Sequence, residues 1–462
     1  MNAEELKNEL CYNPQHACAV VDQKVIAEAD RFAEGYKVFL NEAKTEREAT
    51  ATIVEIAKSR SFVEFDPYKQ YKAGDKVYYV NREKSIILAV IGKKPLTEGV
   101  KIAAAHIDSP RLDLKPNPLY ESDELALFKT HYYGGIKKYQ WVAIPLALHG
   151  VIIKADGTKV DVKIGEEEGE PKFVISDILP HLGAEQGKRT LSEGIAGEEL
   201  NVIVGSRPFN NDKGSELVKL NVLKLLNEKY GIKEADFLST ELEVVPAFKA
   251  DDIGFDRGLI GSYGHDDRVC AYPAAMAAFS VDAPDYTSIS VLTDKEETGS
   301  DGNTGLQSDY MKNFIAYLAK ANGLDVFEVL SKSECLSADV NSAYDPTFSS
   351  VFEKNNTSFL NKGVVITKYT GARGKSSTSD ASAEYMGKIR RMLDENNIVW
   401  QIGELGKVDA GGGGTVAKYI AKLDVDVVDL GVPVLSMHAP YEVISKLDLY
   451  MAFKAFVKFF EQ

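Results

Sequence analysis

Five segments of this 462-residue sequence place histidine or carboxylate side chains at the end of an apolar run or in a turn. Open α/β sheets carry functional groups at the carboxyl ends of their strands, so metal-binding or titratable residues would meet at such positions. Taken singly, each segment has an ordinary explanation, such as a structural histidine, a helix cap or a solvated pair of acids. The segments are 104–110, 263–268, 292–300, 336–339 and 434–440, and they contain His106, Asp108, Asp266, Glu296, Glu297, Asp339 and His438.

Taken together, these segments supply two histidines and three carboxylates at sheet edges, with a glutamate to spare. That inventory fits two divalent cations bridged by one carboxylate, each with a further histidine and a further carboxylate. Imidazole and carboxylate without thiolate suit zinc, and also cobalt or manganese. Such a pair of ions lowers the pKa of a bound water and polarises a scissile carbonyl. The spare glutamate would carry the proton from the water to the leaving amine, which indicates hydrolysis of an amide bond.

The elements that must position these residues are those of an α/β sheet covered by helices. The runs 85–91 and 100–106 are nearly continuous apolar stretches, typical of strands buried on both faces. Residues 24–58 carry apolar side chains at helical spacing. From residue 264 onward, helix-like runs alternate with strand-like runs: we expect helices over 270–279, 309–322 and 445–460, and strands over 288–292, 335–338, 363–368 and 427–430.

The middle of the chain has a different pattern of residues. Between about 115 and 250, short alternating strands such as 160–164 are bounded by turn signals. The acidic run 165–169 is expected to be a solvated hairpin tip. Because the α/β pattern resumes near 251, the sequence predicts a discontinuous catalytic domain, 1–114 and 251–462, interrupted by a β-rich domain over 115–250.

Charge and composition exclude some classes of protein. The net charge of −15 argues against a nucleic-acid partner, which would need a basic face. No apolar stretch approaches the roughly 18 residues of a membrane span. The chain opens without a charged and then apolar leader, and its four cysteines form no CxxC pair. We therefore expect a cytoplasmic protein with reduced thiols and no membrane partner.

The five segments resemble the motifs of the aspartyl aminopeptidases and the vacuolar aminopeptidase I group, in the same order and spacing over nearly the whole chain. In this sequence the motifs are AAAHIDSPRLDLKPNP (103–118), HDDR (265–268), DKEETGS (294–300), SAD (337–339) and GVPVLSMHAPYE (431–442). The resemblance implies a metalloaminopeptidase that hydrolyses the N-terminal bond of peptides. It also implies an α/β phosphorylase/hydrolase-like mixed sheet, the zinc exopeptidase fold, with an inserted β-rich dimerisation domain.

The same resemblance implies a set of metal ligands in this chain. His106 would bind one zinc ion and His438 the other, with Asp266 as the bridge between them. Glu297 and Asp339 would complete the ligand sets of the two ions. The family thereby implies two zinc ions as cofactors, for which cobalt or manganese could substitute.

Three further roles follow from the resemblance. Glu296 would be the general base, and Asp108 would orient His106. Within Leu-Pro-His-Leu (179–182), His181 would reach into the active site of a neighbouring subunit and bind substrate there. The family also implies a homo-oligomer in which dimers assemble into a dodecamer.

Two departures from the eukaryotic members leave the preferred N-terminal residue open between acidic and apolar. Trp141 is followed by Val142 where those members carry an Asp-Arg pair, and no histidine follows the SAD motif. Lys368, Arg373 and Lys375 could still bind an acidic side chain. The glycine run 411–414 is either a flexible turn or a close approach to the substrate.

Two rival functions have to be weighed against an aminopeptidase. One is another co-catalytic zinc hydrolase, such as a carboxypeptidase or an amide deacylase. The insertion between His106 and Asp266 disfavours it. The other is a non-catalytic assembly protein that keeps the fold, and it predicts missing ligands, whereas all five ligands and the base are present.

Overall fold

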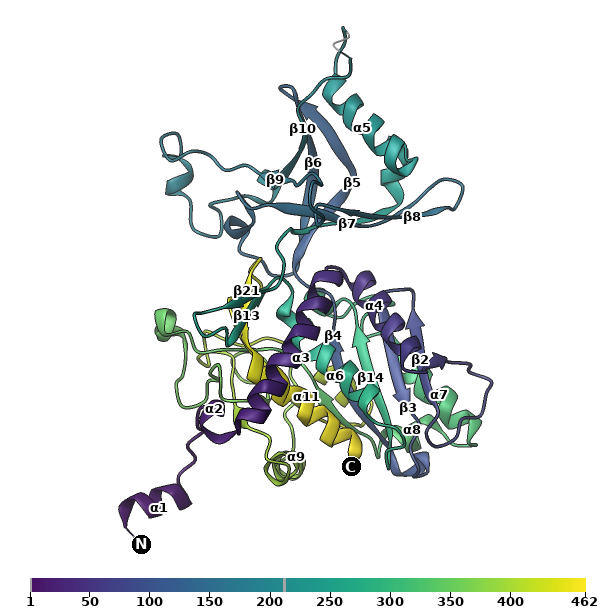
Figure 1. Ribbon diagram of the computed structural model, residues 1–462, viewed down its shortest axis with the longest axis vertical. Helices are drawn as coiled ribbons and strands as arrows, with labels where there is room; N and C mark the ends of the chain where they lie inside the picture. The colour runs from purple at the N-terminus through teal and green to yellow at the C-terminus, as the bar shows by residue number, and fades with distance from the viewer. Residues whose placement is uncertain (1, 211–212) are drawn as a thin grey trace.

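A mixed sheet runs through the larger, lower body of the computed structural model, which describes residues 2–210 and 213–462 (Figure 1). Within those ranges it has nine strands in the order β1-β2-β3-β14-β4-β15-β19-β17-β18. The central strands β14, β4, β15 and β19 are parallel, whereas β3 and β17 run antiparallel to their inner neighbours. The bounds are β1 (Val63–Glu64), β2 (Lys76–Asn81), β3 (Ser85–Val90), β14 (Thr287–Thr293), β4 (Val100–His106), β15 (Glu334–Ser337), β19 (Asp426–Gly431), β17 (Val364–Thr367) and β18 (Trp400–Ile402).

Helices cover both faces of this sheet, and strand β4 shows how the two cores divide. Ala103 and Ala105 point into one core, whereas Ile102 and Ala104 point into the other. The alternation is the period of two that a strand imposes on its side chains. The first core is covered by α3 (Gln23–Glu42), α4 (Glu46–Ser59), α6 (His265–Ser280), α9 (Ala383–Glu395) and α11 (Lys446–Glu461), and the second by α7 (Tyr310–Ala321), α8 (Val326–Leu330) and α10 (Ala417–Ala421).

The region of helical spacing over 24–58 forms two helices, α3 and α4, and Thr45 marks the break between them. The Thr45 side chain accepts a hydrogen bond from the backbone N–H of Glu48, whose carboxylate accepts one from the backbone of Thr45. This reciprocal capping box satisfies donors that a helix start leaves unpaired, so it begins a new helix. The short helices α1 (Ala3–Leu10) and α2 (Ala17–Val20) precede α3.

A small sheet lies beside the carboxyl ends of the central strands. Within the described ranges its five strands follow the order β12-β13-β21-β20-β16. The turn after β13 leads into α6, the β20–β21 connection contains the expected histidine motif, and β16 follows the SAD motif. Three of the five chemical segments are therefore brought together by this sheet. Its bounds are β12 (Asp251–Ile253), β13 (Leu259–Ser262), β21 (Glu442–Ser445), β20 (Pro433–Leu435) and β16 (Asn341–Ser342).

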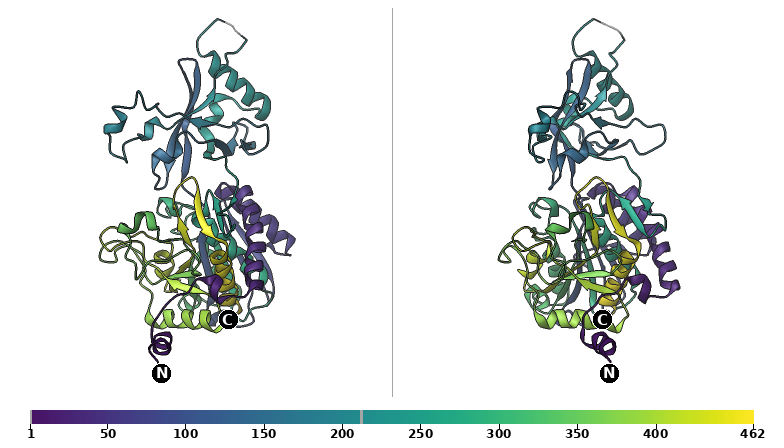
Figure 2. Two further views of the ribbon diagram at one scale, coloured as in Figure 1. Left: turned by 60° about the vertical axis from the view of Figure 1, so that its left-hand side comes forward. Right: turned by 90° about the vertical axis from the view of Figure 1, so that its left-hand side faces the viewer.

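A second body stands on the first (Figure 2) and has its own sheet and its own apolar core. The described residues give this sheet seven strands in the order β8-β7-β11-β5-β6-β10-β9, with helix α5 (Leu217–Tyr230) packed on it. Strand β5 leaves the lower body and β11 returns to it. The bounds are β5 (Arg111–Ser122), β6 (Leu125–Tyr133), β7 (Leu146–Ile153), β8 (Lys159–Ile164), β9 (Val174–Ile175), β10 (Asn201–Gly205) and β11 (Thr240–Pro246).

Short 3₁₀ helices join these elements, and one of them, η6 (Glu296–Thr298), follows β14 directly. In the part of the chain that the structure covers, no helix combines the length and the apolar character that crossing a bilayer requires. The other 3₁₀ helices are Leu96–Glu98, Lys138–Trp141, Gln186–Lys188, Gly197–Glu199, Glu234–Ser239 and Pro346–Val351.

The prediction that the acidic run 165–169 is a solvated hairpin tip is wrong at Glu166. The side chain of Glu166 is only 5% exposed, and its Oε1 lies 3.3 Å from His149 Nε2 and 3.7 Å from Lys44 Nζ. Lys44 belongs to the lower body and His149 to the upper sheet. Burial of a charge costs free energy unless a partner offsets it, and these partners keep Glu166 buried where the two bodies meet.

The close packing of α6 on β4 yields a test of stability. Replacing Ala105 with leucine should lower the free energy of unfolding by about 1–3 kcal/mol, because extra methylenes in a well-packed core force neighbours to shift. Urea unfolding followed by circular dichroism measures the change. Ala51→Leu, on the exposed side of α4, is the matched control and should be nearly neutral. Equal effects of the two substitutions would contradict the packing argument.

Candidate metal centre

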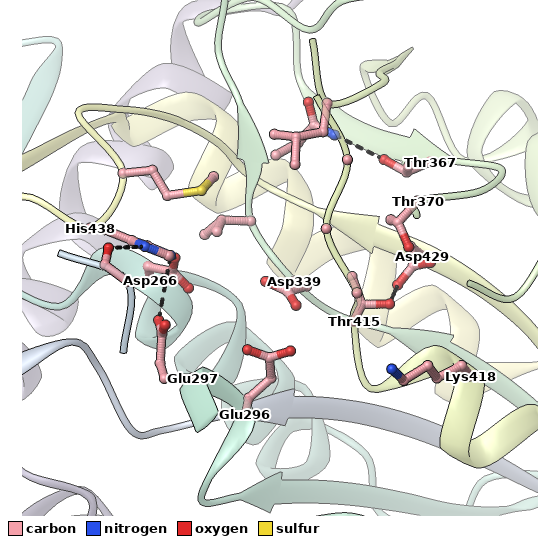
Figure 3. Close-up of a pocket in the computed structure, with 18 of the residues that line it drawn as sticks. Asp266, Glu296, Glu297, Asp339, Thr367, Thr370, Thr415, Lys418, Asp429 and His438 are labelled. Carbon is pink, nitrogen blue, oxygen red and sulfur yellow. Dashed lines mark hydrogen bonds and ion pairs between the residues drawn. The ribbon is translucent and has the colours of Figure 1, made fainter. Parts of the chain in front are cut away.

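Asp266 lies between two histidines that are more than three hundred residues apart in the sequence. Figure 3 shows it beside one of them, His438. Its Oδ1 is 3.1 Å from His106 Nε2, and its Oδ2 is 3.2 Å from His438 Nε2. Each carboxylate oxygen therefore faces a different imidazole. A carboxylate placed in this way can bridge two metal ions, which is the role that the resemblance implies for Asp266.

Two further acids extend the cluster, one on each side of Asp266. Asp339 Oδ1 is 3.8 Å from His106 Nε2, and Glu297 Oε1 is 3.7 Å from His438 Nε2. Among the described residues, three triads have ligand atoms within 4.8 Å of one another, and all of them lie in this cluster. None of the three includes His438, which joins the cluster through its contacts with Asp266 and Glu297. The triads are His106–Glu296–Asp339, His106–Asp266–Glu297 and Asp266–Asp267–Asp339.

Strand register brings these residues to one edge. His106 is the last residue of β4 and pairs with Thr293 of β14, so η6 and its Glu296 begin next to it. Ser337 of β15 pairs with Ala104, which places Asp339 on the other side of β4. The carboxyl ends of parallel strands thus supply half of the cluster, as the sequence predicted.

Asp108 is fully buried and contacts more than the histidine that it was expected to orient. His106 Nδ1 lies 3.3 Å from Asp108 Oδ1 and 3.0 Å from the Asp108 main-chain oxygen. The Asp108 carboxylate also accepts hydrogen bonds from the backbone N–H groups of Glu296 (3.1 Å) and Glu297 (3.2 Å). It therefore holds the turn that carries both glutamates as well as the ring of His106.

Glu442 has a similar position on the opposite side, and the sequence reasoning missed it. Its Oε1 accepts a hydrogen bond from the backbone N–H of His438 at 2.7 Å, and its Oε2 accepts one from that of Asp266 at 3.0 Å. Burial, followed by the charge of Asp266, raises the pKa of the Glu442 carboxyl to about 8. A signal was available, since Glu442 lies four residues after His438 in the last motif.

The electrostatics of the cluster call for a cation. Burial, and then the charges of neighbouring acids, raise the pKa values of Glu297 and Asp339 well above their usual range. The same causes raise the pKa of Glu296 to about 7, although His106 opposes them. In the described structure, Glu297 Oε1 and Asp267 Oδ1 are buried without a hydrogen-bond partner. Crowded, buried carboxylates with free oxygens are poorly stabilised by protein alone and are suited to metal ions.

The cluster opens into a cavity of about 440 Å³, whose opposite wall carries Thr415, Asp429 and Lys418 (Figure 3). Residues 412–414 of the glycine run also line it, which favours the close-approach interpretation of that run. Two of the basic residues that could bind an acidic side chain, Lys368 and Lys375, both pair with Asp380. Lys418 lines this cavity instead.

His181 lies apart from the residues that the cluster brings together. It is exposed in the connection between β9 and β10, on the upper body, and does not belong to the cavity lining found among the described residues. Its neighbours Leu179 and Leu182 are also exposed, at 49% and 69%. Within a single chain, seven of the eight predicted site residues therefore meet, and His181 does not.

Comparison with known proteins assigns this site to a family. The model of the family described as aminopeptidase I zinc metalloprotease (M18) matches residues 39–460. The chain belongs to the M18 family. A probable M18 family aminopeptidase 1 from Clostridium acetobutylicum is 47% identical over 453 residues, which cover 96% of this chain and 97% of the relative.

Two solved structures share the fold of this M18 chain. An M18 aminopeptidase from Thermotoga maritima superposes with a TM-score of 0.92 at 43% identity, covering 97% of this chain and 99% of that one. The mApe1 dodecamer of S. cerevisiae superposes with a TM-score of 0.77 at 20% identity, covering 94% and 97%. The expected mixed α/β architecture is thereby confirmed at the level of the family.

The M18 chain is a zinc metalloaminopeptidase, as the sequence predicted. Its donors fit that metal, because the cluster offers imidazole nitrogens and carboxylate oxygens and no thiolate. Ligand atoms at about 2.0–2.1 Å from a tetrahedral zinc ion lie roughly 3.3 Å apart. The separations of Asp266 from His106 and from His438, 3.1 and 3.2 Å, are close to that value.

Zinc should therefore stabilise the folded protein. Zinc at a thousand times its dissociation constant should add about 4 kcal/mol to the free energy of unfolding, and a chelator should remove that gain. Thermal unfolding with and without zinc measures the effect. Asp266→Asn should abolish most of the response, whereas Asp429→Asn, the same change on the opposite wall of the cavity, should keep it. The same zinc response in both variants would contradict the placement of the metal at Asp266.

Proposed function

We propose that this M18 aminopeptidase holds two zinc ions, bridged by Asp266. His106 and Asp339 would bind one ion, and His438 and Glu297 the other. The observation that supports this division is that the two oxygens of Asp266 face the Nε2 atoms of different histidines, and each of these Nε2 atoms has one further carboxylate within 4 Å. Cobalt or manganese could occupy the same donors.

Glu296 is the proposed general base. When bound, the zinc ions would lower the pKa of a water and polarise the scissile carbonyl. The Glu296 carboxylate lines the cavity beside His106 and Asp339, and its backbone is fixed by Asp108. It would accept the proton of the attacking water and deliver it to the nitrogen of the leaving amine. Asp108, from the other side of the ring, would keep His106 in the tautomer that leaves Nε2 free as a ligand.

The substrates are proposed to be peptides with a free N-terminal amine. The cavity lining combines apolar Leu405 and Met437 with the cation of Lys418. Apolar side chains of a substrate would contact Leu405 and Met437, and acidic side chains of a substrate would pair with Lys418.

Activity measurements on a panel of aminoacyl anilides test this proposal. Wild-type enzyme loaded with zinc should release anilides that carry a free amine and leave their N-acetylated forms intact. Glu296→Gln should lower kcat by about 10²–10⁴-fold while zinc binding persists. Asp301→Asn, in the exposed loop after η6, should retain wild-type activity. Release from acetylated substrates, or full activity of Glu296→Gln, would contradict the proposed chemistry.

For the rest of the chain, we propose a zinc exopeptidase fold over 1–114 and 251–462, with 115–250 as an inserted dimerisation domain. Ile178, Leu179 and Leu182 support this role, because they expose apolar surface around His181. Dimers would assemble into a dodecamer, as in the mApe1 structure. His181 would then bind substrate in a neighbouring subunit's active site. A cytoplasmic location would keep the four free cysteines reduced.

A mixing experiment tests whether His181 acts between subunits. His181→Ala and Glu296→Gln should each be poorly active alone. Assembled together from a mixture of unfolded chains, they should recover up to about a quarter of wild-type activity, because half of the pairs are mixed and one site of each is complete. Analytical ultracentrifugation gives the size of the particle. A mixed assembly without recovered activity would rule out the exchange of His181, and a stable monomer would rule out the assembly.

A further inference from the structure

The segment 133–135 begins with the last residue of strand β6 in the upper sheet, yet it lies against the metal centre of the lower body. The Tyr133 hydroxyl donates a hydrogen bond of 2.7 Å to Asp108 Oδ2. That carboxylate is the same one that accepts the backbone N–H groups of Glu296 and Glu297 and contacts His106. A phenol from the upper sheet therefore completes the set of donors around Asp108.

Gly135 makes a second contact of this kind on the other side of the cluster. Its main-chain oxygen lies 2.8 Å from His438 Nδ1. A histidine that donates from Nδ1 to a carbonyl presents the unprotonated Nε2 to a metal ion. Nε2 of His438 is the atom that faces Asp266 and Glu297. The carbonyl of Gly135 thus selects the tautomer that the proposed ligand set requires.

Gly134, between these two residues, shows how closely the segment approaches. Its backbone has φ +74°, and a Cβ added there would lie 3.1 Å from Glu297 Oε2 and 3.3 Å from Glu297 Cβ. Glycine adopts this left-handed conformation without strain and leaves room for the side chain of Glu297. A larger residue at this position would crowd Glu297 and strain the backbone.

Tyr133 is itself held by a buried arginine. Arg111, at the start of β5, is the register partner of Tyr133, and its guanidinium lies 3.9 Å from the centre of the Tyr133 ring. Arg111 is anchored by Glu46 of α4 at 3.3 Å and by Glu243 of β11 at 3.2 Å. The phenol is therefore fixed from both bodies of the molecule, and its orientation toward Asp108 does not depend on a mobile side chain.

We propose that residues 133–135 form a positioning segment through which the upper sheet sets the geometry of the metal centre in its own chain. Tyr133 positions Asp108, and through it the turn of Glu296 and Glu297, while Gly135 fixes the tautomer of His438. The inference rests on the proposed ligand set. It gives the upper sheet a role in catalysis that is separate from any role in assembly.

Tyr133→Phe removes the hydroxyl alone, and Tyr132→Phe is a matched control, because Tyr132 is the adjacent, 42% exposed tyrosine of the same strand. Tyr133→Phe should lower zinc affinity, measured by chelator competition on metal-free protein, by up to about tenfold, because the hydroxyl contacts Asp108 and not a proposed ligand, whereas loss of a ligand's direct partner costs about 10–100-fold. At saturating zinc, kcat should fall while KM changes less than about twofold. Tyr132→Phe should match wild type in all three quantities.

A double substitution shows whether the hydroxyl acts through Asp108. If it does, adding Tyr133→Phe to Asp108→Asn should cost far less zinc affinity than it costs in the wild-type background. Additive losses, or a Tyr133→Phe enzyme that equals Tyr132→Phe, would overturn the inference. Should Tyr133→Phe fail to fold, Gly134→Ala, which presses on Glu297, should also lower zinc affinity. A wild-type protein that binds no zinc would instead overturn the proposed ligand set, so the two failures are distinguishable.

Discussion

The structure depends on the carboxylate of Asp266, which must remain ionised in an almost completely buried position. Burial alone would raise its pKa, but the imidazoles of His106 and His438, which face its two oxygens, outweigh burial and hold that pKa below its usual range. Ser109 and Glu442 then hold its backbone, the first at the carbonyl and the second at the N–H. A buried charge of this kind is tolerated only when its partners offset the cost of removing it from water, so the fold must hold those partners in place.

Those partners come from distant parts of the sequence, and this explains the architecture of the lower body. Small side chains on β4 and α6 allow the helix to lie directly on the strand, which brings the start of α6, with Asp266, to the end of β4, with His106. The small five-stranded sheet then adds the hairpin of His438. The carboxylates of Asp108 and Glu442 accept backbone N–H groups and so fix η6 and the loop that carries His438.

Much of this centre was predictable from the sequence. Strands buried on both faces appear as nearly continuous apolar runs, so the residues at their carboxyl ends can be named. The positions of His106 and Asp339, two of the proposed ligands, follow from that rule once the strand order is known. Tyr133 and Gly135 could not be found in this way, since they lie in an alternating region whose placement over the centre depends on long-range packing. Glu166 was misjudged for a related reason: three successive acids indicate solvent, and only the tertiary structure supplies Lys44 and His149 as partners.

The buried contact of Glu166 also determines where the chain can be lengthened. Loop tips usually tolerate inserted residues because little depends on their path. The turn after β8 is different, because its Glu166 reaches Lys44, whose Nζ in turn donates to the carbonyls of Pro246 and Phe248 on the returning segment. The turn between β5 and β6, at Asp123 and Glu124, is exposed at the far end of the same sheet. A fused tag or reporter domain is therefore compatible with the β5–β6 turn, whereas one placed after β8 would separate the two bodies.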